Sequence, residues 1–446
     1  MSKLLLSNAR LVNEGEIRDV DVLIEGQRIS SIAASISAPA GATVIDLSGK
    51  YLMPGMIDDQ VHFREPGMIH KGDLATESAA AAAGGITSFM DMPNVNPLTT
   101  TRTALRDKYA MAESRCTANY GFHFGATNSN IEEIKALQVG EAAGIKGFMG
   151  ASTGDMLIDD PDALEKLFEH APIIVLTHCE DSPMIWGNES AARKKFGDDV
   201  PFSEHPAIRS AEACLKSSSY AVDLASRHDA LLHVLHLTTA IEMALFSNTH
   251  RSKKRITAEV CVHHLWFDDS RYDELGASMK CNPAIKRKED REALIAALNE
   301  DRIDIIATDH APHTAEEKAN KYFQSPAGLP LVQHALLTLF DLAQDGQLSI
   351  ELIVDKACHA PADLFGVKDR GYVREGYFAD LVVVDPTRPY SVKRSNLLSK
   401  CQWSPFEGHE FSSSIDTTIV NGDVVYCDGR LTGIVAGQKL EFGRAR

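Results

Sequence analysis

Strand-like and helix-like segments alternate through the middle of the chain. Short apolar runs recur there, and helix-like stretches such as "DLATESAAAAAG" and "PDALEKLFEH" separate them. The runs are "GMIDDQVHF", "GITSFMDMPN", "NYGFHFGAT", "GIKGFMGAS", "PIIVLTHCED", "LLHVLHLTT", "RITAEVCVHHL" and "RIDIIATDHAPH". Eight strands with connecting helices predict an α/β fold, a closed (β/α)8 TIM-type barrel of parallel strands. An open doubly wound sheet is the alternative, but it favours a glycine-rich phosphate turn that this sequence lacks.

The two ends of the chain differ from the middle. Residues 1–52 and 370–446 resemble short strands separated by turns, as in "DVDVLIEGQRISSIAA" and "IDTTIVNGDVVYCDGRL". We therefore predict a small β-sandwich domain formed by both ends, with residues 53–369 as the barrel. A length of 446 residues suits one barrel with such an annex.

Charge and composition limit the classes of binding partner and the cellular compartment that we expect for this chain. The formal net charge of −17 argues against nucleic acid or an anionic membrane as a partner, although one local arginine can still bind a small anion. No run reaches about 18 apolar residues, and the N-terminal apolar run is too short for a signal peptide. The eight cysteines form no C-x-x-C pair. We expect a cytoplasmic protein with free thiols and no cysteine zinc site.

Residues able to bind a metal or an anion fall near the ends of the predicted strands. In a barrel these ends converge on one face, where active sites are built. The residues are Gln60, His62, Arg64, Asp91, Asn94, Lys146, His178, His236, Asp309, His310 and His313. A single histidine at a strand end is commonly structural, but the joint pattern predicts a metal site.

Lys146, in "AGIKGFMG", is the most informative of these residues. Burial in the barrel lowers a lysine pKa and favours the neutral amine, which can add carbon dioxide to form a carbamate that bridges two cations. An ordinary lysine whose ammonium reaches solvent is the alternative. Imidazoles such as those of His178 and His236 suit Zn²⁺ or a similar ion. Asp309 can be both a ligand and a proton carrier, or simply a helix N-cap.

These motifs together resemble the amidohydrolase superfamily and, within it, the dihydroorotases of pyrimidine biosynthesis. The resemblance covers nearly the whole chain and rests on "PGMID", "HFREPG", "AAAAAGGITSFMDMPN", the strand lysine, two strand-end histidines, "CNPAIK" and "ATDHAPHTAEEK". It implies a metal-dependent hydrolase that interconverts dihydroorotate and N-carbamoyl-L-aspartate. It also implies one or two Zn²⁺ ions per chain and a homodimer.

The resemblance assigns roles to individual residues. Lys146, as an N6-carboxylated bridge, would hold the more buried ion with His178 and His236. His62 and Asp309 would hold the second ion, and Asp309 would also be the general base that takes the proton of a metal-bound hydroxide. The substrate carboxylate would contact Arg64, Asn94 and His313, and the ring amide would contact Asn282.

Allantoinases and hydantoinases are the closest alternatives. Their fold and metal site resemble those implied here, and "STGDMLIDD", residues 152–160, is similar to allantoinases. Their substrates lack the ring carboxylate, however. The presence of both Arg64 and His313 therefore favours dihydroorotase.

Gln60 departs from the family pattern D-x-H-x-H, which here reads Asp58-Asp59-Gln60-Val61-His62. If residues 58–64 are extended, Asp58, Gln60, His62 and Arg64 share one face and Asp59 points to the other. Three hypotheses follow: a one-metal enzyme, a second ion held weakly through Gln60 or a water, or a metal-poor non-catalytic paralogue that serves as a structural partner. We favour catalysis because the other site residues are all present.

Three further expectations concern the surroundings of the site. Residues 313–330 are polar and follow Asp309, so they form a pocket wall, a lid or a plain surface connection. His263 and His264 end the seventh strand, where we expect structural packing. We expect Asp58 to orient its neighbours without binding metal.

Overall fold

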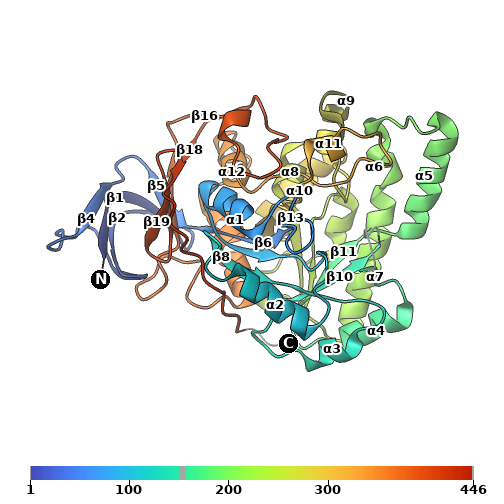
Figure 1. The fold of residues 1–446 in the computed structure, drawn as a ribbon, viewed down its shortest axis with the longest axis horizontal. Coiled ribbons are helices and arrows are strands. Elements are labelled where there is room, and N and C mark those ends of the chain that lie inside the picture. The colour runs from blue at the N-terminus through green and yellow to red at the C-terminus, as the bar shows by residue number, and fades with distance from the viewer. Residues whose placement is uncertain (1, 151–155, 444–446) are drawn as a thin grey trace.

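The predicted barrel is present in the structure, a computed structural model that describes residues 2–150 and 156–443 (Figure 1). Residues 152–155 of the "STGDMLIDD" stretch lie outside the described residues. The barrel strands are β6 (Met56–Val61), β7 (Ile86–Asp91), β8 (Asn119–Phe122), β9 (Phe124–Gly125), β10 (Ile145–Met149), β11 (Val175–Cys179), β12 (Leu232–Val234), β13 (Ile256–Cys261) and β14 (Ile305–Ala307). Because β8 and β9 are two parts of one strand interrupted at His123, these elements correspond to the eight predicted strands.

Two parallel sheets make up the ring of strands. One has the order β14-β13-β12-β11-β10-β9, and the other has the order β6-β7-β8. The ring closes where Val61 pairs in parallel with His310 and where the His62 backbone N–H donates to the His310 carbonyl at 2.7 Å. Strand order therefore follows chain order around the barrel, as a (β/α)8 fold requires.

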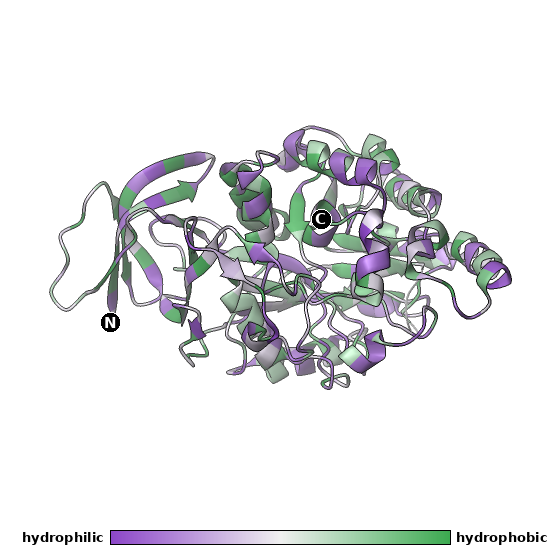
Figure 2. Cartoon of the chain, turned by 90° about the horizontal axis from the view of Figure 1, so that it is seen from above, coloured by the Kyte–Doolittle hydropathy of each residue, from purple (hydrophilic) through white to green (hydrophobic). Residues whose placement is uncertain are grey.

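Helices surround the strands, and Figure 2 shows hydrophobic and hydrophilic residues side by side along them. Capping side chains fix several helix starts: Asp73, Asp181 and Ser210 each accept a backbone N–H of the first turn. The helices are α1 (Leu74–Ala83), α2 (Arg102–Ala112), α3 (Ile131–Ala136), α4 (Pro161–His170), α5 (Ser182–Phe196), α6 (His205–Ile208), α7 (Ala211–Arg227), α8 (Val262–Trp266), α9 (Tyr272–Leu275), α10 (Lys288–Asn299), α11 (Ala315–Lys318), α12 (Ala335–Gln344), α13 (Ile350–Val354) and α14 (Ala360–Phe365).

Both ends of the chain contribute to one nine-stranded sheet beside the barrel, drawn in blue and red in Figure 1. Its strands are β1 (Lys3–Asn13), β2 (Glu16–Glu25), β3 (Arg28–Ala33), β4 (Thr43–Asp46), β5 (Tyr51–Pro54), β15 (Leu381–Asp385), β18 (Ser414–Val420), β19 (Asp423–Cys427) and β20 (Arg430–Leu431). The antiparallel pairing of β5 with β15 joins the two ends. The small pair β16 (Tyr390–Ser391) and β17 (Glu410–Phe411) lies apart. The fold is thus a TIM-type barrel with a β-sandwich domain, while the division at residues 52 and 369 stays a prediction.

Strand β6 does not keep the regular alternation that we expected for residues 58–64. Asp58 pairs with Phe89 and Val61 pairs with Asp91, so β6 carries one more residue than β7 over this stretch. Such an insertion is a β-bulge, which turns side chains away from strict alternation. The strand ends at Val61, and Arg64 adopts a left-handed backbone with φ of 70°.

Two sequence expectations about the whole chain can be compared with the structure. All eight cysteines are free thiols, as predicted. Among the described residues, no helix combines the length and the apolar character needed to cross a membrane.

Candidate active site

One pocket at the carboxyl ends of the barrel strands contains all the site residues predicted from the sequence except Asp91 and His310, which pair with Lys108 and Glu77 outside it. Its volume is about 140 Å³. The lining residues are Gln60, His62, Arg64, Asn94, Lys146, Phe148, His178, His236, Asn282, Asp309, Ala311, His313, Pro326, Ala327 and Gly328. Three of them, Arg64, His236 and Asp309, have positive φ angles of 70°, 39° and 51°. Such backbone costs about 1–3 kcal/mol each and clusters at functional sites.

Lys146 is buried in the pocket wall without an acceptor. Lys146 belongs to β10 and is 1% exposed. Its Nζ has no hydrogen-bond partner within the described part of the chain. Nζ lies 4.5 Å from the centre of the Phe148 ring. Burial lowers the pKa of Lys146 to about 8, with Asp309 opposing the shift. A buried amine that is readily neutral and unpaired fits the carbamate suggested by the sequence.

His178 and His236 present ring nitrogens to the same point in the pocket. Nδ1 of His178 lies 3.0 Å from Nε2 of His236. Two nitrogens bound to one tetrahedral zinc ion at about 2.0–2.1 Å lie about 3.3 Å apart, so this spacing fits a shared cation. Burial lowers the pKa of both imidazoles, which favours the neutral form that binds metals.

Glu180 fixes the orientation of His178, and sequence reasoning missed it. Nε2 of His178 donates to Oε2 of Glu180 at 2.9 Å, which leaves Nδ1 as the nitrogen that faces the pocket. Arg209 forms an ion pair of 2.5 Å with the same oxygen. Burial raises the pKa of Glu180, but Arg209 and His178 outweigh it and bring the pKa to about 2. The available signal was the acid two residues after His178 in "THCED".

His62 and Asp309 form a second pair of convergent donors. Nε2 of His62 lies 3.1 Å from Oδ1 of Asp309, and Nδ1 of His62 lies 2.7 Å from Oδ1 of Asn94. Burial raises the pKa of Asp309, but the hydrogen bond and charge of His62, followed by His263 and Lys146, outweigh burial and lower it. Asp309 is therefore a carboxylate able to accept a proton or bind a cation. Asn94 supports His62 here, although the resemblance implied contact with substrate.

Gln60 differs from an imidazole in what it offers the pocket. Its Nε2 donates to Oδ1 of Asp309 at 3.1 Å, and its Oε1 has no partner among the described residues. The free oxygen is a possible ligand, but the amide N–H competes for the Asp309 oxygen that faces His62. The number of metal ions per chain therefore stays a prediction.

Arg64 and His313 lie together on the other side of the pocket. Nη2 of Arg64 is 3.0 Å from Nε2 of His313, and Nζ of Lys71 is 3.1 Å from Nδ1 of His313. Lys71 also pairs with Glu317 at 3.0 Å. Burial, then Arg64 and Lys71, lower the pKa of His313 far below its ordinary value, so the ring is neutral. Lys71 lies seven residues after Arg64 in a turn, where no motif marks it as part of the site.

Asp58 and Asp59 lie outside the pocket lining, on different sides of β6. Asp58 accepts hydrogen bonds from the Thr308 backbone N–H at 3.2 Å and the Thr308 hydroxyl at 2.6 Å, next to Asp309. Asp59 does not point away from the barrel interior as expected, because the bulge in β6 turns it inward. Its carboxylate lies near His233 on β12 and Glu259 on β13, which are not neighbours of β6.

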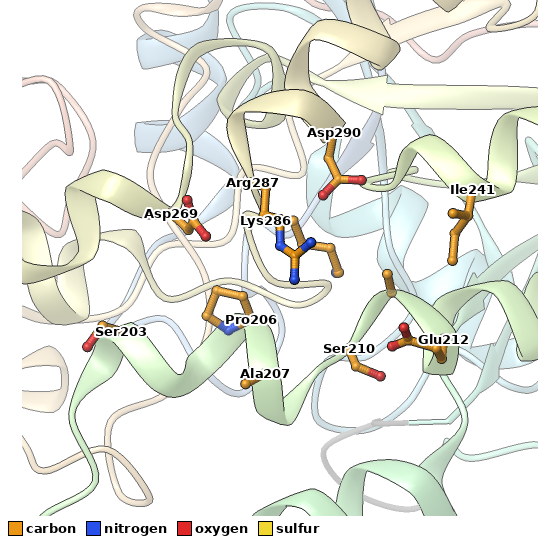
Figure 3. Close-up of a pocket in the computed structure, with 11 residues that line it drawn as sticks. Ser203, Pro206, Ala207, Ser210, Glu212, Ile241, Asp269, Lys286, Arg287 and Asp290 are labelled. Carbon is orange, nitrogen blue, oxygen red and sulfur yellow. The ribbon is translucent and has the colours of Figure 1, made fainter.

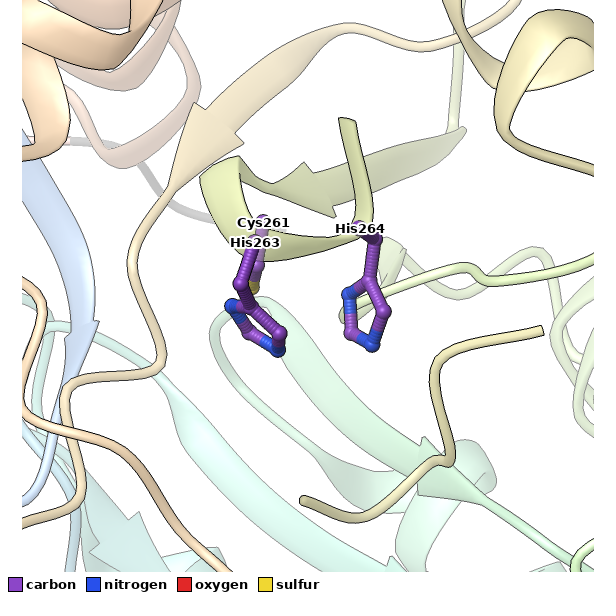
Figure 4. Close-up of side chains that lie close together, drawn as sticks. All are labelled: Cys261, His263 and His264. Carbon is purple, nitrogen blue, oxygen red and sulfur yellow. The ribbon is translucent and has the colours of Figure 1, made fainter. Parts of the chain in front are cut away.

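His263 and His264 lie in α8, just after Cys261 at the end of β13, and Figure 4 shows the three side chains close together. The two imidazole rings have centres 3.9 Å apart. Nε2 of His264 donates to the Pro283 carbonyl at 3.2 Å. Neither histidine lines the pocket, in keeping with the structural role expected for them.

Residues 313–330 contribute to the pocket wall through Pro326, Ala327 and Gly328. Two buried lysines hold the segment: Nζ of Lys318 donates to three backbone carbonyls, and Nζ of Lys280 donates to those of Tyr322 and Ser325. The segment is thus a wall in this structure, and its movement as a lid stays a prediction.

A larger cavity of about 480 Å³ lies near the start of α7 (Figure 3). Two of its charged groups, those of Asp290 and Lys286, already have partners. Asp290 accepts the Ala240 backbone N–H at 2.8 Å, and Nζ of Lys286 donates to the Thr238 hydroxyl at 2.9 Å. The smaller pocket, with its unpaired lysine and convergent imidazoles, is the better candidate for catalysis.

Comparison with known proteins places the chain in a family. The model of the Amidohydrolase family matches residues 51–425. A protein named dihydroorotase from Halobacterium salinarum is 34% identical over 433 residues, covering 94% of this chain and 97% of that protein. A protein named dihydroorotase from Bacillus cytotoxicus is 32% identical over 433 residues, covering 95% of this chain and 98% of that protein.

The fold matches a solved structure over its whole length. An L-hydantoinase (dihydropyrimidinase) from Arthrobacter aurescens has a TM-score of 0.93 at 26% identity, covering 99% of this chain and 100% of that chain. The chain belongs to the amidohydrolase family and, within it, to the dihydroorotase group. It is a hydrolase, and its family is metal-dependent.

Proposed function

We propose that this hydrolase acts on cyclic amides and interconverts dihydroorotate and N-carbamoyl-L-aspartate. The relatives named dihydroorotase support this substrate, as does the pocket chemistry. The observation that carries the proposal is the pair of donors, Arg64 and His313, in the same pocket as Lys146 and Asp309. Dihydroorotate has a ring amide to hydrolyse and a carboxylate to bind, and this pocket offers groups for both.

The hydrogen bonds around His313 favour an anion beside it. A neutral imidazole has one acceptor nitrogen, so it can accept from Lys71 or from Arg64 but not from both. The ammonium of Lys71 can only donate to Nδ1, which places the ring proton on Nε2, where the Ala327 carbonyl accepts it at 3.1 Å. Nη2 of Arg64 then faces an N–H group and lacks an acceptor there. A carboxylate between these donors would supply one, and a guanidinium matches its two oxygens.

The residues present fit a divalent cation, and we propose Zn²⁺, one or two ions per chain. Lys146, N6-carboxylated, would hold it with His178 and His236, while His62 and Asp309 would hold a second ion, with or without Gln60 as a further ligand. When bound, such a cation lowers the pKa of water and polarises a carbonyl. The unpaired Nζ of Lys146 and the close imidazole nitrogens support this assignment.

The chain's own groups account for positioning and proton transfer. Arg64 and His313 would hold the carboxylate, and Asn282, whose Oδ1 is buried and unpaired among the described residues, would accept a ring N–H. Asp309 would take a proton from the attacking water and give it to the leaving nitrogen. Its lowered pKa keeps it ionised for the first of these steps.

Two other functions remain distinct from this proposal. The similarity to the Arthrobacter aurescens L-hydantoinase favours a neutral cyclic substrate as the second candidate. A metal-poor structural paralogue is the third, and the Gln60 substitution is the observation behind it. We further propose a homodimer and a cytoplasmic location, on the basis of the net charge of −17 and the similarity of the chain to proteins named dihydroorotase.

An absorbance assay separates these functions. Purified protein loaded with Zn²⁺ is mixed with dihydroorotate, and ring opening is followed, with allantoin and hydantoin as control substrates. Turnover of dihydroorotate alone supports the proposal. Turnover of hydantoin or allantoin without dihydroorotate supports the second candidate. No turnover by a protein that retains no zinc after loading supports the third.

A further inference from the structure

Three buried residues from three strands gather in the barrel interior, deeper than the pocket. Asp59 lies on β6, directly before Gln60. His233 lies on β12, three residues before His236, and Glu259 lies on β13. All three are 0% exposed, and their ligand atoms lie within 4.8 Å of one another. None of them lines the pocket. We call Asp59, His233 and Glu259 the interior cluster.

The ring of His233 turns one nitrogen towards the two carboxylates. Nδ1 contacts the Thr257 hydroxyl at 2.8 Å, and that hydroxyl donates to the Leu232 carbonyl at 3.2 Å. The hydroxyl oxygen therefore accepts from Nδ1–H, and the ring proton is on Nδ1. Nε2 points to Asp59 and Glu259. Burial lowers the pKa of His233, but the two acids outweigh burial and raise it to about 9, so a cation bound here would displace the Nε2 proton. Histidines that bind metals are held in the same way, by a hydrogen bond from the other ring nitrogen.

The distances within the interior cluster are too long for good hydrogen bonds. Nε2 of His233 is 3.5 Å from Oδ2 of Asp59 and 3.7 Å from Oε2 of Glu259. Hydrogen bonds between N–H and O span about 2.7–3.2 Å, whereas ligand atoms around one zinc ion lie about 3.3 Å apart. The observed spacings are nearer to the second value.

The carboxylates also lack donors. Both oxygens of Asp59 and Oε2 of Glu259 have no hydrogen-bond partner in the described ranges, and neither has Nε2 of His233. Only Oε1 of Glu259 is bonded, to the His236 backbone N–H at 3.1 Å and the Cys261 thiol at 3.5 Å. A buried carboxylate without donors is strongly unfavourable unless a cation neutralises it. Protonating His233 at Nε2 would place one positive charge near two acids and still leave Asp59 Oδ1 unpaired.

We propose that Asp59, His233 and Glu259 bind a divalent transition-metal ion, separate from the ions of the pocket. One neutral imidazole and two carboxylates balance a charge of +2 and suit Zn²⁺ or Mn²⁺. The ion joins β6 to β12 and β13 across the barrel, so its role is structural. The bulge in β6 makes the site possible because it turns Asp59 inward.

The group of Cys261, His263 and His264 is a weaker candidate for a metal site. Nε2 of His264 and the thiol of Cys261 are already engaged with Pro283 and Glu259. The interior cluster instead directs four unpaired atoms to one point.

Anomalous diffraction from crystals of the metal-loaded protein tests the proposal directly. Crystals grown with Zn²⁺ are measured on both sides of the zinc absorption edge. The proposal predicts a peak bonded to Asp59, His233 and Glu259, in addition to any peak at Lys146. A peak confined to the pocket, or a water refined between the three side chains, would overturn it.

Metal analysis of variants provides a second test that does not depend on turnover. Asp59→Asn should lower the zinc content by about one ion per chain, because a neutral amide binds zinc poorly. Asp58→Asn is the matched control, since Asp58 is an adjacent buried acid with its own partner, Thr308, and zinc content should not change. Equal zinc content in wild type and Asp59→Asn would contradict the proposal. If the variant does not fold, the diffraction experiment on the wild-type protein decides the question.

Discussion

Two groups of buried polar side chains share the barrel, the pocket around Lys146 and the interior cluster of Asp59, His233 and Glu259. Both combine carboxylates with imidazoles, and β6 contributes to each of them, through Gln60 in the pocket and Asp59 in the interior cluster. The pocket has a cavity of about 140 Å³ and, at Lys146, a buried amine with no hydrogen-bond partner among the described residues. The interior cluster is sealed, with 0% exposure at all three residues. Position along a strand thus decides whether the same chemistry can meet a substrate or only stabilise the fold.

Replacing the carboxylate of Asp309 in the pocket should have the largest effect, because it should abolish most of the activity while leaving the interior cluster intact. Asp309→Asn should lower kcat by about 10²–10⁴-fold, because the amide cannot accept a proton from water. Steady-state kinetics with dihydroorotate measure this loss, and circular dichroism checks folding. Asp341→Asn is the control, because Asp341 is bonded to Ser412 outside the pocket. A variant of Asp309 with kcat near wild type would place the general base elsewhere.

Arg64→Met tests the part of the pocket that we propose to bind the substrate carboxylate. Loss of charged hydrogen bonds worth about 1.5–3 kcal/mol should reduce kcat/KM for dihydroorotate by about 10–150-fold. Dihydrouracil, which has the ring amide but no carboxylate, is the matched control substrate. The variant should treat it as the wild type does. Equal losses on both substrates would mean that Arg64 supports the pocket structure rather than carboxylate binding.

The support of His178 is tested by Glu180→Gln. The variant keeps the size of the side chain but weakens its hold on the His178 ring, so zinc affinity should fall by about 10–100-fold. Competition with a chelator measures the affinity. Because Glu180 does not belong to the interior cluster, zinc at Asp59 should be retained, and this separates the two groups. Unchanged affinity for every bound ion would contradict the account.

A buried histidine outside both groups should give the smallest effect. Burial lowers the pKa of His334 to about 3, from an unfolded value of about 6.5. Between these values the unfolded chain binds a proton that the folded chain does not, so stability falls as the pH falls through this window. At pH 5.5 the loss from His334 is about 1.4 kcal/mol relative to pH 7.5. Urea unfolding of His334→Gln should show a shallower decline than wild type, and an identical decline would exclude this source.

The barrel and its pocket were predictable because strand ends converge in a parallel barrel. Lys146, His178, His236 and Asp309 each follow an apolar run, and the periodicity of such runs is visible in the sequence. The predicted pocket residues therefore came together even though each of them was ambiguous alone.

The orientation of Asp59 and the contacts of Lys71 were not predictable in the same way. A one-residue bulge in β6 reverses the side-chain direction that alternation implies, and alternation is the only guide that sequence offers. Lys71 reaches His313 from a turn far away in sequence, so only tertiary packing brings the two together. Glu180 was predictable only in part. Its spacing from His178 is visible in the sequence, but its ion pair with Arg209 is not.

A crystal structure of the zinc-loaded protein with N-carbamoyl-L-aspartate bound would test the central claim most directly. The account predicts a substrate carboxylate within hydrogen-bond distance of Arg64 and His313, with the reacting amide beside Asp309. A ligand bound with its carboxylates away from Arg64, or bound in the larger cavity near α7, would contradict it.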